Sequence, residues 1–112
     1  MKQDFENLYL DFSNTGYSLY VVYDKTTGKD ISGIIPAAND LVAVGSFVEF
    51  IEKQKDKIQP YSEYVLKLIG HYNVLDISIN DCSEMEILSS KENVKEYYDN
   101  LINYYNKINK ED

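Results

Sequence analysis

The stretch YSLYVVYDKTTGKDISGIIPAANDLVAVGSFVEFIEKQ, residues 17–54, decides the fold because its hydrophobic period changes along the chain. Tyr17 to Tyr23 is rich in β-branched and aromatic residues, which predicts a strand with little solvent on either face. Turn residues follow, with Gly28 able to supply positive φ, and the short apolar run Ile31 to Ile35 completes a predicted β-hairpin. Pro36 is expected to stop the second strand, because proline cannot donate to a ladder.

A helix is predicted directly after this hairpin. Asn39 or Asp40 is a suitable N-cap, since the side-chain oxygen of either can accept from an unpaired backbone amide. From Leu41 to Gln54 the apolar residues fall on one stripe at helical spacing. Gly45 lowers helix propensity, so its presence indicates close packing against the sheet.

Two further strands are predicted in the second half of the chain. Glu63 to Gly70 alternates in the manner of a strand, and Tyr72 to Ile79 predicts a fourth strand. The turn between them is expected near Gly70 to Asn73. The acidic stretch that follows, Asn80 to Ile87, is predicted to be a loop.

A long helix is predicted to end the chain. Ser89 and Glu92 have the spacing of a capping box, and the helix is expected to continue to Lys110. One seam of this helix has spacings of three and four, which are typical of a coiled coil; it contains Tyr97, Leu101, Tyr104 and Ile108. Two interpretations stay open: the seam packs on its own sheet, or it binds a partner and promotes self-association.

The chain of 112 residues is long enough for one hydrophobic core. We therefore predict a single α+β domain over residues 1–112. A small antiparallel sheet with one packed helix occupies residues 17–79, and a long C-terminal helix occupies residues 90–110.

Charge limits the functions that this chain can have. Eleven Lys and no Arg stand against nineteen Asp and Glu, for a formal net charge of −8. A generally basic nucleic-acid-coating protein is excluded, so any DNA contact must be local. A single cysteine fits a reducing compartment, and no signal peptide or apolar run of membrane-spanning length is found, so neither secretion nor membrane insertion is expected.

No catalytic, metal or cofactor site is predicted. Cys82 could be a nucleophile with His71 as its base, but the neighbouring Asp81 and Glu84 would raise the pKa of the thiol. The acidic residues around them lack the ligand order of a calcium loop and are interpreted as a solvated loop. We expect a protein that is not an enzyme.

One group of residues has the chemistry of single-strand binding. Tyrosines on a sheet beside lysines can stack bases and follow phosphates. The candidate DNA-binding residues are Tyr20, Tyr23, Lys25, Lys29 and Lys67, with Tyr17 beside them. The alternative is that these strand tyrosines only pack in the core or at a sheet edge.

A family resemblance follows from an ordered series of short matches. They are Val21 to Gly28, Pro36, Asn39-Asp40, Ala43, Phe47, Pro60, Glu63-Tyr64, Leu66, Ile69-Gly70 and Tyr72-Asn73. In order and spacing this series, over about Tyr17 to Asn73, resembles the small nonstructural protein of the gokushovirus branch of microviruses.

The resemblance implies a role in the host cytoplasm during viral DNA replication and packaging. In that family the protein is regarded as a counterpart of microvirus protein C, which meets the replication complex and diverts new single-stranded DNA into the procapsid. Two hypotheses follow. The first is a nonenzymatic adaptor that meets the viral replication protein and procapsid and touches single-stranded DNA weakly. The second is a protein-interaction module without DNA contact, acting on a host factor.

Overall fold

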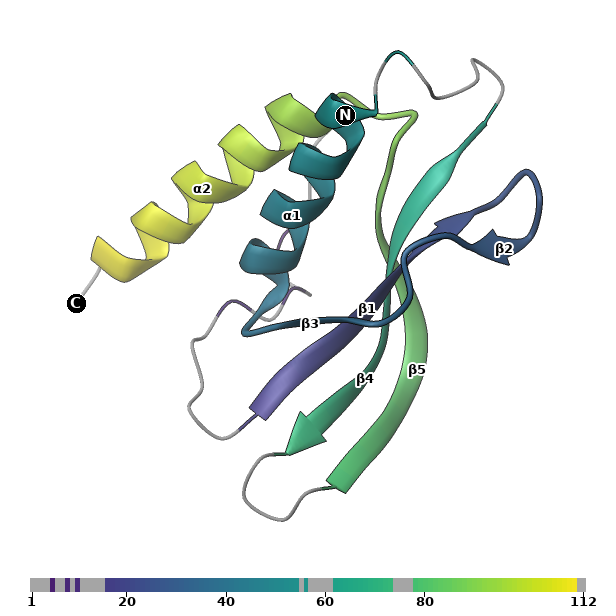
Figure 1. The fold of residues 1–112 in the computed structure, drawn as a ribbon. Helices are drawn as coiled ribbons and strands as arrows, with labels where there is room; N and C mark the ends of the chain where they lie inside the picture. Colours follow the sequence, from purple (N-terminus) through teal and green to yellow (C-terminus); the bar gives the residue numbers. More distant parts are fainter. Residues whose placement is uncertain are drawn as a thin grey trace.

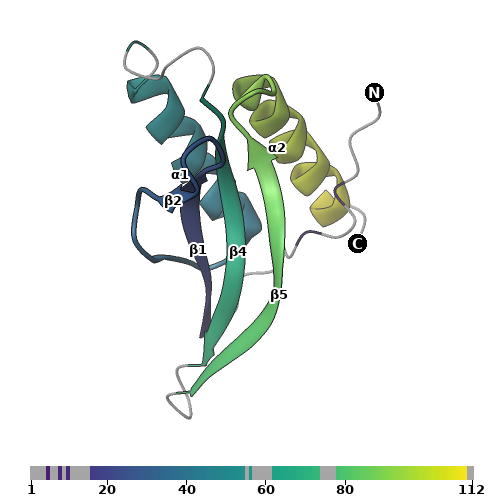
Figure 2. The same cartoon turned by 90° about the vertical axis from the view of Figure 1, so that its right-hand side faces the viewer.

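The computed structural model describes residues 5, 8, 10, 16–54, 56, 62–73 and 78–110, with side chains for all of these except 78–83, 109 and 110. The elements are β1 Gly16–Asp24, β2 Lys29–Asp30, β3 Ile35–Ala37, α1 Asp40–Lys53, β4 Tyr64–Asn73, β5 Ser78–Ser89 and α2 Val94–Lys110. In this part of the chain the five strands form one antiparallel sheet, in the order β2-β1-β4-β5 with β3 also paired to β1. Both helices lie on the same side of the sheet (Figure 1, Figure 2). The predicted α+β fold is confirmed.

The predicted hairpin forms, but its second strand is only two residues long. Tyr23 pairs with Asp30 in β2, and the chain then leaves the ladder. The hydroxyl of Ser32 accepts from the backbone N–H of Val22 at 2.8 Å, and Gly33 has a φ of 70° that turns the chain. The prediction of a strand over Ile31 to Ile35 is therefore wrong: only Ile35 lies in a strand, and that strand is β3.

Pro36 lies inside β3, where the sequence predicted the end of a strand. It is paired with Leu19 of β1, and no further strand pairs with β3 among the described residues. An edge strand tolerates proline because the missing N–H would have pointed away from the ladder.

Helix α1 begins one residue earlier than predicted. The side chain of Asn39 accepts from the N–H of Val42 at 3.0 Å, which identifies Asn39 as the N-cap. Gly45 faces α2, and the prediction that it packs against the sheet is wrong. A Cβ at Gly45 would lie 3.0 Å from the Tyr98 hydroxyl and 3.2 Å from its ring, so glycine lets the two helices approach closely.

Strands β4 and β5 are longer than predicted. The turn expected near Gly70 to Asn73 is wrong, because these residues continue β4, and residues 74–77 of the predicted fourth strand lie outside the described residues. The acidic stretch Asn80 to Ile87 is part of β5 and not a loop. Two register shifts along β5 let it pair with most of β4.

Helix α2 begins at Val94, later than the capping box predicted. The N–H of Glu96 donates to Asn93 Oδ1 at 3.1 Å, as expected of an N-cap. Ser89 still belongs to β5, and its hydroxyl donates to Glu63 at 2.6 Å. One half of the predicted box forms, since the N–H of Ser89 donates to Glu92 at 3.3 Å.

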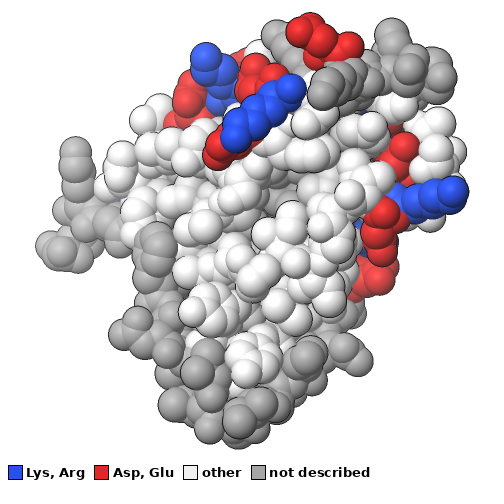
Figure 3. Space-filling view, viewed as in Figure 1, with Lys and Arg blue, Asp and Glu red and all other residues white. Residues whose placement is uncertain are grey.

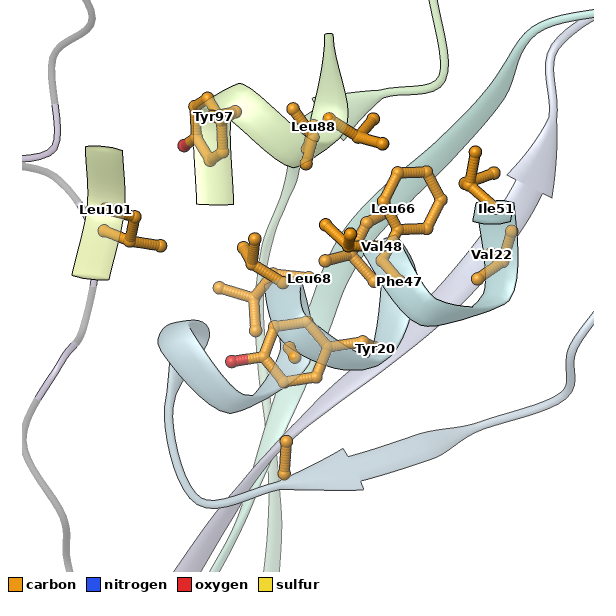
Figure 4. Close-up of a cluster of buried hydrophobic side chains, with 14 of the residues drawn as sticks. Tyr20, Val22, Phe47, Val48, Ile51, Leu66, Leu68, Leu88, Tyr97 and Leu101 are labelled. Carbon is orange, nitrogen blue, oxygen red and sulfur yellow. The ribbon is translucent and has the colours of Figure 1, made fainter. Parts of the chain in front are cut away.

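One hydrophobic core joins the sheet to both helices (Figure 4). The largest fully buried side chains include Tyr20 of β1, Phe47 of α1, Leu66 of β4, Leu88 of β5 and Leu101 of α2. The core therefore draws on every layer of the fold. The sequence predicted one packed helix, but α2 is packed as well.

Candidate functional site

The face of the sheet opposite the helices carries most of the predicted DNA-binding residues. Val22 and Leu66 are paired across β1 and β4 and belong to the core, so the alternate residues Tyr23 and Lys67 point to the other face. The Lys67 ammonium lies 4.6 Å from the centre of the Tyr23 ring, a cation–π contact. The sequence prediction thus places these two residues together correctly.

Two glutamates of β5 hold the lysines of this face. Lys25 lies 3.1 Å from Glu86, and Lys67 lies 2.9 Å from Glu84. The hydrogen bond that each lysine donates to its glutamate raises the pKa of that lysine above the usual value. We call Tyr23, Lys25, Lys67, Glu84 and Glu86 the lysine–glutamate network. Its two positive and two negative charges give a net charge of zero.

Lys29 lies next to this network. It is exposed in β2, opposite Asp24 of β1. Asp30 is close enough to Lys67 to contribute to its raised pKa, and Glu63 does the same for Lys25. The surroundings of the lysines are therefore acidic, and a phosphate would have to compete with carboxylates for them.

Tyr20 is not available to stack a base. It is fully buried, and its hydroxyl donates to the buried carboxylate of Asp40 at the start of α1. Figure 4 shows its ring in the core among Phe47 and Leu68. Assigning Tyr20 to a DNA site is therefore wrong. The strand is apolar on both faces, so its sequence does not reveal which tyrosine points outward.

The seam of α2 faces the protein's own core along most of its length. Tyr97 and Leu101 are buried, and the Tyr97 ring meets the Phe5 ring edge to face at a centroid distance of 5.3 Å. Tyr104 is half-buried and lies 5.4 Å from the same Phe5 ring. Ile108 is exposed. The assignment of Tyr97 and Leu101 to a partner surface is therefore wrong.

Burial also affects the chemistry of the seam. The removal of Tyr97 from water, with Glu92 and Asp40 nearby, raises its pKa to about 12. Tyr97 is therefore a neutral core residue at physiological pH.

Of the two residues weighed for catalysis, the structure describes the side chain of His71 only. His71 is exposed, and its Nδ1 lies 3.2 Å from the hydroxyl of Ser18, which is buried. The Cys82 side chain lies outside the described residues, so its proposed pairing with His71 stays untested. Among the described side chains, no group of three or more His, Cys, Asp and Glu is arranged to hold a metal ion.

The sequence interpretation missed a second surface. From Ile31 to Val48 the chain has one charged residue, Asp40, and that residue is buried. We call the outward side chains of residues 31–48 the uncharged face. In Figure 3 the centre of the uncharged face lies over α1 and β3. Charged side chains are seen along the upper and right-hand margins of this face. The signal is visible in the printed sequence as a long gap between charges in a chain that is 27% charged.

Neither helix, in the part of the chain that the structure describes, has the length and apolar character needed to cross a membrane. Comparison with family models, with curated proteins and with solved structures finds no match to this chain.

Proposed function

We propose that the chain is a nonenzymatic adaptor that binds protein partners during the packaging of single-stranded viral DNA. The proposal joins the resemblance to gokushovirus nonstructural proteins with one structural observation. Lys25 and Lys67, two of the three lysines that DNA binding would use, are already paired with Glu86 and Glu84. A protein partner does not require these cations to be free, whereas a phosphate backbone does.

The partners in this proposal are the viral replication protein and the procapsid, and the place is the host cytoplasm. The net charge of −8 supports a protein partner, because it opposes the approach of a polyanion. It also favours partner surfaces that carry lysine and arginine.

A weak single-strand contact remains the second part of the proposal. Tyr23, Lys25 and Lys67 lie together on one sheet face with Lys29 beside them. The Lys25–Glu86 pair is exposed on both sides, and exposed ion pairs contribute only about 0–1 kcal/mol, so a phosphate can displace Glu86 from Lys25 at low salt. The contact is then limited by the network, and because it involves few phosphates its affinity should fall only modestly as the salt concentration rises.

The DNA arm of the test uses fluorescence anisotropy with a labelled oligothymidine across a salt series. The wild type should bind weakly, with a slope of log affinity against log salt shallower than about −1.4. The double variant Glu84→Gln, Glu86→Gln frees two lysines, and its slope should reach about −1.4, at about 0.7 per phosphate contact. Glu49→Gln is the matched control, because it removes the partner of Lys53 on α1, 2.8 Å away, outside the sheet face.

The protein arm uses purified gokushovirus capsid and replication proteins on a surface that carries the full chain. Binding of either one supports the adaptor. Failure of both to bind, under conditions where the chain is folded, would refute it. If the wild type already shows the slope of the double variant, the network does not limit DNA binding and that part of the proposal is wrong.

A further inference from the structure

The uncharged face contains exposed apolar side chains that nothing in the described part of the chain covers. Ile34 is 63% exposed and Ile31 is 41% exposed, in the segment between β2 and β3. Pro36 is also exposed, and Val42 presents an exposed side chain from the first turn of α1. These exposed apolar side chains follow one another along a stretch of chain without exposed charge, which makes the stretch a candidate interaction site.

The distribution of charge argues for the kind of partner. The formal net charge of −8 lies almost wholly outside residues 31–48, whose one carboxylate is buried under the hydroxyl of Tyr20. Two copies of this chain repel each other wherever their acidic surfaces meet. They can approach at the uncharged face without bringing like charges together, and depletion of charge is typical of the centre of homodimer interfaces.

A surface without charge also gives no means of selecting a basic partner. The acidic margins of the molecule would attract such a partner instead, through residues such as Glu84 and Glu86. The composition of the uncharged face therefore fits a second copy better than a charged protein or a nucleic acid.

The mode of contact follows from Pro36. Two edge strands can join by adding to one sheet, but β3 has three residues, and its central one has no N–H to donate. Contact through side chains is the remaining way for two copies to meet at this edge.

We propose that two copies of this chain form a symmetric dimer through the uncharged face, and that Ile31 and Ile34 are buried in the interface. This inference goes beyond the adaptor function and does not depend on it. It also places self-association on a different surface from the α2 seam.

The test measures the mass of the full chain by sedimentation equilibrium over a range of concentrations up to about 1 mM. The wild type should approach the dimer mass. Ile34→Asp should weaken the dimer by roughly tenfold or more, as expected when a charge replaces an apolar side chain that the interface buries, and Ile31→Asp should do the same. Both residues are exposed, so circular dichroism should show an unchanged fold. The matched control is Ile108→Asp, at an exposed isoleucine of α2, which should leave the dimer intact.

Salt provides an independent readout. Two chains of charge −8 repel each other across the interface margin, so added salt should tighten the dimer or leave it unchanged. A wild type that stays monomeric throughout the range overturns the proposal. A dimer that survives Ile34→Asp but is lost in Ile108→Asp also overturns it, and so does a dimer that weakens steeply with salt.

Discussion

Replacing Leu101 by alanine tests whether the seam of α2 belongs to the core of its own chain. Leu101 is 0% exposed and lies in the hydrophobic cluster that joins both helices to the sheet. Truncation of a buried leucine costs about 2–5 kcal/mol, and a fully enclosed site belongs in the upper half of that range, about 3.5–5 kcal/mol. A chain of 112 residues has a total free energy of unfolding of about 6–17 kcal/mol, so the loss should be large.

Urea titrations followed by circular dichroism measure this loss, and each should be run at two protein concentrations. Because Leu101 packs within its own chain, the difference between variant and wild type should be the same at both concentrations. Ile108→Ala, at an exposed position of the same seam, should change stability by no more than about 0.5 kcal/mol. A loss below about 1 kcal/mol for Leu101→Ala, or a loss that changes with concentration, would place the seam between chains and refute the reasoning.

Three further predictions concern other contacts of the core. Tyr20→Phe removes the hydroxyl that donates to a buried carboxylate and should cost about 1.5–3 kcal/mol in urea titration, whereas Tyr23→Phe, which keeps the ring under Lys67, should cost little. Gly45→Ala should not deliver the gain of about 1 kcal/mol expected from helix propensity, because the new methyl group meets Tyr98; the same substitution in a Tyr98→Ala background should recover that gain. Burial raises the pKa of Tyr97 from 10.0 to about 12, so the folded state holds its proton longer than the unfolded state does. The free energy of unfolding should therefore keep its full value below pH 10 and fall as the pH rises toward 12. This decrease should be smaller in Tyr97→Phe.

Much of the fold can be predicted from local patterns. Strand β1 and helix α1 are marked by β-branched runs, by helical spacing and by the cap at Asn39, and each prediction is right to within one or two residues. The errors lie where tertiary contacts override these patterns. Gly70 was interpreted as part of a turn but continues β4, where it pairs with β1. Ser89 has the sequence of a cap but is engaged in β5, so that Asn93 caps the helix, which begins at Val94.

The candidate site was harder to predict because it depends on which face each side chain occupies. Tyr20 and Tyr23 belong to the same strand, and an odd separation of three positions puts them on opposite faces of the sheet. One is buried in the core, and the other lies under Lys67. A strand that is apolar on both faces does not show this difference in its composition, so only the packing of α1 decides it.

The acidic stretch of β5 connects the error in the fold with the error in the site. Glu84 and Glu86 were interpreted as a solvated loop because they are charged, yet Met85 between them packs against the core, which is the alternation of a strand with one face in water. Once β5 is a strand, its register with β4 sets Glu86 opposite Lys67, and the two glutamates reach the two lysines. The same residues therefore complete the sheet and neutralise two of the three lysines that a DNA site would need. A lysine on a strand can be assigned to phosphate binding only after the charges of the neighbouring strand are known.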